Sequence, residues 1–132
     1  MVDDGVDIGH PDGASLLAVG PFLFIRVGRD SADRRALLDT GASLSCIDVE
    51  LADALGLPIV DRRQLTSVTG VTEGSPVYLA RMRIPTLDRV VHGTFAGVSL
   101  GSLNLAVLLG RDFLARYRMV YDGRSGSVTL AG

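Results

Sequence analysis

Apolar and polar residues alternate along many short segments of the chain, and this two-residue period predicts β-strands. The clearest case is Phe22 to Val27, which ends at Gly28. The same kind of reading predicts strands at Ser15–Ala18, Arg35–Leu38, Ser43–Ile47, Gln64–Thr69, Val77–Ile84, Arg89–Leu100, Leu103–Leu109, Met119–Asp122 and Ser127–Leu130. So many short strands are typical of a mainly β protein.

Only two segments favour short helices. Asp48 is a suitable N-cap for a helix over Val49 to Leu55, with Gly56 as its stop. A second short helix is expected over Asp112 to Arg118, after Gly110. Because a closed barrel leaves few strand edges exposed, we expect the strands to close into one.

The glycine-bounded segment from Gly70 to Gly74 separates two predicted strands and indicates a long hairpin. Residues 1–14 are rich in Asp and Gly and show no period, which favours a flexible lead-in. The chain has 132 residues, the size of one domain, so we expect that domain to span residues 15–132.

Composition excludes several function classes. The net charge is −2 with no concentrated basic face, so nucleic acid is not an expected partner. One cysteine and two distant histidines match no zinc spacing, and we expect neither metal nor cofactor. The start is acidic and no apolar segment is long enough to span a membrane. We therefore expect a cytoplasmic protein, or one domain of a larger or membrane-tethered parent.

Two motifs carry candidate chemistry. In the first, Leu37 and Leu38 run into Asp39, followed by Thr, Gly, Ala and Ser. In the second, the apolar pair Leu108 and Leu109 precedes Gly110 and continues as Arg-Asp-Phe-Leu. An Asp before Thr and Gly is, by itself, more often a turn former than a catalyst. The combination of both motifs favours catalytic ancestry.

Together the two motifs resemble those of the retropepsin-like, or retroviral-type, single-domain aspartic proteases and their bacterial relatives. In that family an apolar pair precedes Asp-Thr/Ser-Gly-Ala/Ser, and a later apolar, apolar, Gly element lies beside that loop. The resemblance covers residues 15–130. It implies a closed six-stranded acid protease barrel, a half-lobe with one or two short helices and a flap hairpin.

The resemblance also implies a reaction. Two carboxyls in contact share one proton, so one can take a proton from a water while the other donates to the scissile carbonyl. Because the chain holds a single such motif, the second Asp39 must come from another copy in a C2 homodimer. Thr40, Gly41 and Ala42 would support the loop, and small residues there allow close approach of the backbone.

The hairpin from about Thr66 to Leu79 would be the flap over a protein or peptide substrate. Its expected tip contacts are Val68, Thr69, Gly70 and Val71. The plainer alternative is an ordinary exposed hairpin, and Glu73 is an unusual residue for an apolar flap tip.

Three other residues have plainer interpretations. Arg111 is expected in a structural ion pair, and Asp112 as a helix cap rather than a catalyst. Cys46 reads as a buried small hydrophobe, because no His lies near it in the sequence.

Two function classes follow. The first is an aspartic endopeptidase that cleaves extended protein segments. The alternative is a catalytically silent retropepsin-like module for peptide binding or dimerisation, which the polar lead-in and atypical flap favour. A small-ligand-binding β-barrel with a coincidental Asp-Thr-Gly-Ala is a third reading.

Overall fold

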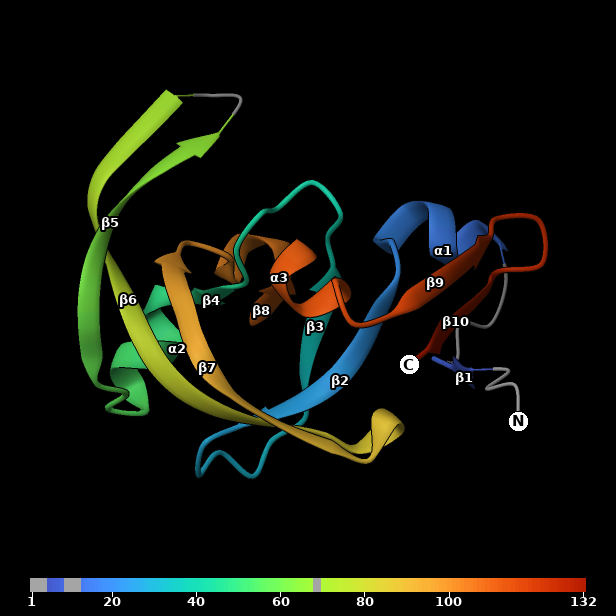
Figure 1. Ribbon diagram of the computed structural model, residues 1–132, viewed down its shortest axis with the longest axis horizontal. Coiled ribbons are helices and arrows are strands. Elements are labelled where there is room, and N and C mark those ends of the chain that lie inside the picture. Colours follow the sequence, from blue (N-terminus) through green and yellow to red (C-terminus); the bar gives the residue numbers. More distant parts are fainter. Residues whose placement is uncertain (1–4, 9–12, 68–69) are drawn as a thin grey trace.

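The computed structural model describes residues 5–8, 13–67 and 70–132. Strands dominate it, and three short helices accompany them (Figure 1). The strands are β1 (Val6–Asp7), β2 (Phe22–Val27), β3 (Arg34–Leu38), β4 (Cys46–Asp48), β5 (Ile59–Ser67), β6 (Gly70–Ile84), β7 (Arg89–Val98), β8 (Val107–Leu109), β9 (Arg118–Asp122) and β10 (Ser127–Ala131). The helices are α1 (Gly13–Val19), α2 (Val49–Ala54) and α3 (Arg111–Leu114), with 3₁₀ turns at Pro85–Leu87 and Gly101–Leu103. The protein is therefore mainly β, as its alternating pattern predicts.

The larger sheet closes on itself. Its strands follow the order β2-β3-β8-β4-β7-β6-β5, and β2 pairs again with β6 through Arg26 opposite Arg83 and Val27 opposite Met82. The ring thus runs through β2, β3, β8, β4, β7 and β6. Strand β5 lies outside the ring and forms a hairpin with β6. Closure of this kind leaves few edges unpaired.

The interior of the ring is filled by aliphatic side chains. Along β2, Leu23, Ile25 and Val27 are buried, while Phe24 between them is exposed. The helix α2 covers part of the core through Ala52 and begins where the Asp48 carboxylate accepts a hydrogen bond from the Leu51 amide. The predicted N-cap and helix are confirmed.

A second, three-stranded sheet has the order β1-β10-β9 and lies beside the ring, at the right in Figure 1. The predicted pairing of the last two strands is confirmed, with Ser127 opposite Asp122 and Leu130 opposite Met119. In the segment read as a flexible lead-in, Val6 and Asp7 form β1 and pair with β10. Part of that segment therefore belongs to a sheet.

Residues expected as a strand at 15–18 instead lie in α1. Ala and Leu favour helix, Leu16 is buried, and Leu17 is 85% exposed. The helix ends at Gly20, whose φ of 84° suits glycine and whose amide bonds the Leu16 carbonyl at 2.9 Å.

Several further boundaries differ from expectation, among them that of helix α3, which ends at Leu114 whereas the expected helix reached Arg118. The strand predicted from Ser43 begins only at Cys46, and the one predicted from Leu103 begins only at Val107. The hairpin tip is not the segment from Gly70 to Gly74, because β6 already pairs with β5 from Gly70 onward. A pattern of residue types indicates that a strand exists more reliably than where it starts.

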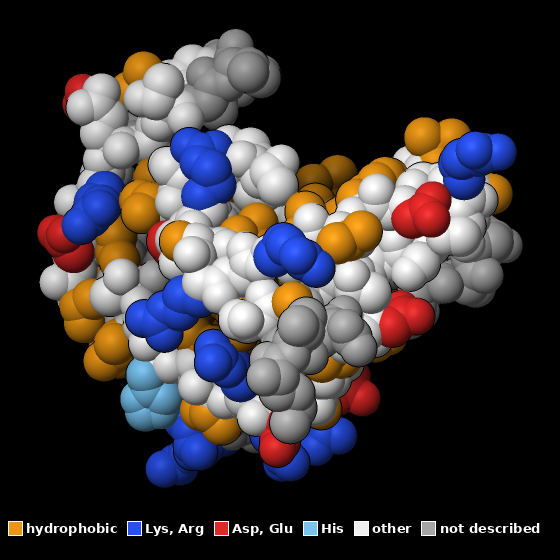
Figure 2. All heavy atoms as spheres, turned by 45° about the vertical axis from the view of Figure 1, so that its right-hand side comes forward, with side chains coloured by type: hydrophobic (Ala, Val, Ile, Leu, Met, Phe, Trp, Pro, Cys, Tyr) orange, Lys and Arg blue, Asp and Glu red, His pale blue; other side chains and the backbone are white. Residues whose placement is uncertain are grey.

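The hairpin of β5 and β6 projects from the ring on the same side as the loop that follows β3 (Figure 1). Figure 2 shows an open hollow between this projection and the rest of the molecule. In the described part of the chain, no helix is long and apolar enough to cross a membrane.

Candidate active site

Asp39 directly follows β3 and is partly buried in a tight turn. Its carboxylate Oδ1 accepts a hydrogen bond of 2.9 Å from the Gly41 amide, and its carbonyl accepts one of 3.2 Å from the Ala42 amide. A Cβ added at Gly41 would lie 3.1 Å from that same Oδ1. A side chain at this position would therefore crowd the carboxylate that the Gly41 amide orients.

The two sequence motifs lie side by side. Strand β3 pairs with β8 in parallel, so that Leu37 lies opposite Leu108 and Leu38 opposite Leu109. The Asp39 amide continues the ladder by donating to the Leu109 carbonyl at 2.9 Å. The expected placement of the apolar, apolar, Gly element beside the Asp loop is thus what the structure has.

Gly110 is where the two loops touch. A Cβ at this position would lie 2.7 Å from the Ala42 carbonyl oxygen and 2.9 Å from two backbone atoms of Leu44. Real Cβ atoms do not approach backbone so closely, so only glycine fits here without displacing the Asp39 loop.

Arg111 clamps the loop from the other motif. Its amide donates to the Ala42 carbonyl at 2.8 Å, and its guanidinium donates to the Thr40 carbonyl at 2.7 Å. The ion pair expected for Arg111 is not found within the described residues. This arginine instead donates hydrogen bonds to backbone carbonyls. The expectation of an ion pair considered only side chains of opposite charge and so missed these contacts.

Ser45 is a residue that the sequence reasoning missed. It is buried, its hydroxyl donates to Asp112 Oδ1 at 2.7 Å, and the same Oγ accepts from the Gly110 amide at 3.0 Å. The Ser45 amide also donates to Asp112 Oδ2 at 3.0 Å. Asp112 is therefore not the helix cap expected of it, since Gly110 occupies the N-cap position of α3.

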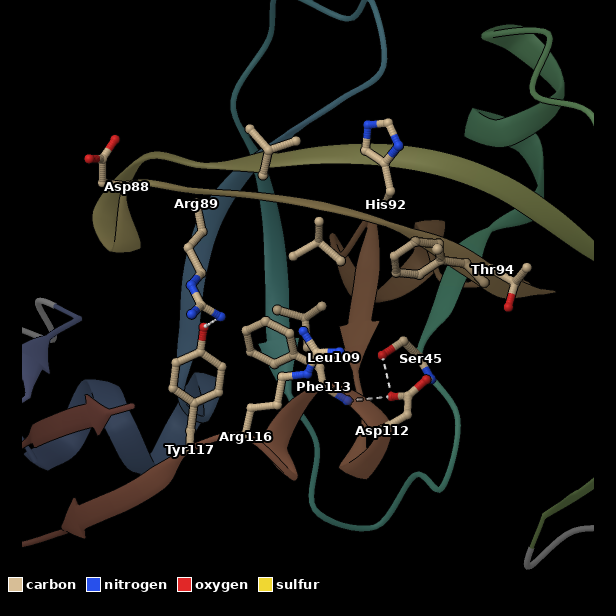
Figure 3. A pocket seen from close by; sticks show the side chains of 14 residues that line it. Ser45, Asp88, Arg89, His92, Thr94, Leu109, Asp112, Phe113, Arg116 and Tyr117 are labelled. Carbon is tan, nitrogen blue, oxygen red and sulfur yellow. Dashed lines mark hydrogen bonds between the residues drawn. The ribbon is translucent and has the colours of Figure 1, made fainter.

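Figure 3 shows the Ser45 and Asp112 side chains pointing toward each other, joined by a dashed line. This bridge ties the far end of the Asp39 loop to the segment after Gly110. The signal for it in the sequence is weak, because a serine before a strand and an aspartate in a helix have many other uses.

Cys46 lies beneath the loop and is buried, as its interpretation as a small hydrophobe predicts. Burial, followed by the charges of Asp112 and Asp39, raises the pKa of the Cys46 thiol to about 11. A thiol that stays protonated at neutral pH is a poor nucleophile. Cys46 therefore has a packing role.

The hairpin residues expected to contact substrate are only partly described. Gly70 lies opposite Ser67 and Val71 opposite Thr66, and the Val71 side chain is 55% exposed. Val68 and Thr69 lie outside the described residues. The contacts of all four with a substrate remain predictions.

Metal ligands do not gather here. Across residues 5–8, 13–67 and 70–132, no group of three or more His, Cys, Asp or Glu side chains is arranged to hold a metal ion. Thr40 contributes its carbonyl to the contact with Arg111, and the support of the loop by its side chain stays a prediction.

Comparisons with known proteins agree with this geometry. The family model described as "gag-polyprotein putative aspartyl protease" matches residues 26–116, which contain both motifs and the hairpin. The curated relative "DNA damage-inducible protein 1" of Neurospora crassa is 25% identical over 119 residues. That match takes in 83% of this chain but 25% of the relative, so the chain spans about a quarter of its length.

Two solved structures show the same fold. One is a retropepsin-like aspartic protease from Rickettsia conorii, with a TM-score of 0.55 and 20% identity over 83% of this chain and 80% of that one. The other is EIAV protease in complex with the inhibitor HBY-793, with a TM-score of 0.54 and 20% identity over 73% of this chain and 86% of that one. The chain belongs to the gag-polyprotein aspartyl protease family, and its fold is that of the retropepsin-like aspartic proteases.

Proposed function

We propose that this chain is an endopeptidase that hydrolyses peptide bonds in extended protein segments, with Asp39 from each of two copies as the catalytic pair. One observation carries the proposal. The Asp39 carboxylate is presented on a turn that the second motif holds through Leu109, Gly110 and Arg111. A general acid or base needs such a fixed position relative to the reacting atoms.

The proposed reaction needs two carboxyls and a water. One Asp39 carboxylate takes a proton from the water, and the oxygen of that water bonds to the scissile carbonyl carbon. The partner's carboxyl gives its proton to the carbonyl oxygen, which produces a tetrahedral diol. Proton transfer to the amide nitrogen then breaks the carbon–nitrogen bond and leaves an acid and an amine. No covalent intermediate with the enzyme forms.

The second carboxyl is proposed to come from a second copy by twofold symmetry. Asp112 lies beside the Asp39 loop, but it does not serve as the second carboxyl here because both its oxygens accept hydrogen bonds from Ser45. A symmetric dimer would place two identical turns together on the axis. An extended substrate would then lie in the hollow seen in Figure 2, and the hairpins of both copies would cover it.

Activity measurements test the proposal directly. The wild-type chain is incubated with a library of extended peptides between about pH 4 and pH 7, where a shared-proton carboxyl pair works. Asp39→Asn keeps the shape of the side chain, and we expect cleavage to fall by at least about a thousandfold. Asp33→Asn, an exposed carboxylate paired with Arg26, is the matched control and should leave cleavage unchanged.

Mixing wild-type and Asp39→Asn chains tests the two-copy site. If each site needs one Asp39 from each copy, an equal mixture at unchanged total chain concentration retains about a quarter of the dimers as wild-type pairs, and activity falls to about a quarter. Activity that falls only to half would contradict a shared site. A chain that binds peptides without cutting them at any pH would instead support the catalytically silent module.

A further inference from the structure

Strand β7 has two halves with different neighbours. Its end, from Ala96 to Val98, pairs with β4, and Ala96 also pairs with Val77 of β6. Its beginning, from Arg89 to Phe95, pairs with β6 on one side only, and no strand pairs with the other side in the described part of the chain. An edge of this kind can accept another strand.

The backbone groups that face the open side follow from the register. The Ala96 amide bonds the Ser45 carbonyl, so it points away from β6, and alternation makes Thr94, His92 and Val90 point the same way. The hydrogen bonds on the far side of β6 support the same assignment of outward-facing groups. His92 lies opposite Arg81, whose carbonyl accepts from the Gly28 amide and so points away from β7.

Beside this edge lies a cavity of about 520 Å³. Figure 3 shows β7 on one side of it and Phe113, Arg116 and Tyr117 on the other. Each residue of an extended strand advances about 3.3 Å, so the free half of β7 matches five to seven residues of a partner. Neither Asp39 nor the hairpin lines this cavity, although Ser45 and Asp112, which support the Asp39 loop, lie at its wall.

The cavity carries cationic groups without anionic partners. Neither Arg89 nor Arg116 forms an ion pair within the described residues. The Arg89 guanidinium donates to the Tyr117 hydroxyl at 2.8 Å and lies 5.4 Å from its ring centre, which holds it at the cavity wall. Of the two lining carboxylates, Asp112 is occupied by Ser45, and Asp88 lies at the end of the edge.

We propose that the open edge of β7 accepts an extended acidic segment of a partner polypeptide as an added strand, with carboxylates of that segment at Arg89 and Arg116. Backbone groups of Val90, His92 and Thr94 provide the hydrogen bonds, and the arginines select acidic over basic partners. Such a segment occupies a surface away from Asp39, and its binding does not depend on peptide cleavage.

The probe is a capped hexapeptide of alternating valine and glutamate, added to the Asp39→Asn chain so that it is not cut. The amide signals of Val90, His92 and Thr94 should shift, and their hydrogen exchange should slow as the peptide is added. The counterpart with lysine in place of glutamate should bind at least about fivefold more weakly. Equal binding of the two peptides would overturn the charge assignment.

His92→Pro removes one outward amide without removing a hydrogen bond between β6 and β7, because proline is tolerated where an edge amide faces outward. We expect this variant to bind the glutamate peptide about tenfold more weakly, while His92→Ala, which keeps the amide, binds as the parent does. Arg116→Gln should also weaken binding, whereas Arg124→Gln, at the exposed turn before β10, should not.

Two results would overturn the proposal. One is that hydrogen exchange at the amides of Val90, His92 and Thr94 stays unchanged although the chain is saturated with peptide, which would place the peptide at another site. The other is strong protection of those amides in a dimer without peptide, which would assign the edge to contact between copies. Both are measured on chains with an unmodified edge, so they do not depend on how well any edge variant folds.

Discussion

The loop after β3 and the outer part of the β5–β6 hairpin are held in contrasting ways. The loop is hydrogen-bonded to residues far along the chain: its amides donate to the Leu109 carbonyl and the Asp112 carboxylate, and its carbonyls accept from Arg111. The hairpin bonds mainly to itself, as where Arg62 donates to the Gly74 carbonyl at 3.1 Å. The proposed catalytic turn is therefore held by distant parts of the chain, whereas the proposed cover is held mainly by the pairing of its own two strands.

The largest effect is expected where the loop is most tightly packed. Gly110→Ala forces a Cβ against the Ala42 carbonyl, and we expect the free energy of unfolding to fall by about 2 to 3 kcal/mol. Urea denaturation measures it. Gly101→Ala is the matched control, since its Cβ would meet no atom within 4 Å, and it should change stability by less than about 1 kcal/mol. Equal midpoints for both variants would show that the loop is not rigid.

The next effect is at the bridge between Ser45 and Asp112. Ser45→Ala leaves the buried Gly110 amide without its acceptor, and we expect a loss of about 1 to 2 kcal/mol. Peptide cleavage should also show a lower kcat with a smaller change in KM. Ser45→Thr keeps a hydroxyl and should recover most of both losses. No recovery with threonine would argue that volume, rather than the hydrogen bond, sets the loop.

The base of the hairpin should show a smaller effect with a distinct pH dependence. Tyr78 is buried and its hydroxyl donates to Asp53 at 2.8 Å, so Tyr78→Phe should cost about 1 kcal/mol. Burial, followed by that hydrogen bond, raises the pKa of Tyr78 to about 12 from an ordinary 10.0. The folded state thus retains this proton longer than the unfolded state.

The sign of the pH effect follows from that difference. The stabilisation linked to the Tyr78 proton is complete below about pH 10 and is lost as pH rises toward about 12. Stability curves for wild type and Tyr78→Phe, measured by thermal unfolding from neutral pH upward, should converge across this range. Curves that stay parallel would contradict the assignment.

The smallest effect on stability is expected at the end of the hairpin. Val71 is 55% exposed, so Val71→Ala should change the free energy of unfolding by less than about 0.5 kcal/mol. If the hairpin covers the substrate, the same change should raise KM a few-fold. Val120→Ala, 47% exposed on β9, is the control and should leave KM unchanged. Equal KM values for both variants would remove Val71 from the substrate surface.

The sequence predicted best those features that local chemistry determines. Alternation located β2 and most of β7, the Asp48 cap located α2, and the two motifs located the contact between β3 and β8. Helix α1 was missed because its short apolar run fits both the helical period and the strand period. The structure shows a helix with Leu16 as its buried residue.

The supporting part of the site could not be read in the same way. Ser45 and Asp112 are 67 positions apart and meet because β4, which follows Ser45, pairs with β8, which leads into α3. The open half of β7 is similarly hidden, since a paired and an unpaired strand show the same alternation. Both features depend on which segments become neighbours, and one sequence alone does not state that.

The parallel contact between β3 and β8 also affects the order in which the molecule can assemble. On a ribosome, the turn at Asp39 emerges long before Leu109 and Gly110, which must arrive before the turn can close. Contacts so distant along the chain form late in folding. A nascent chain therefore exposes the Asp39 carboxylate before its supporting geometry has formed, which would delay activity in the proposed endopeptidase until the chain is complete.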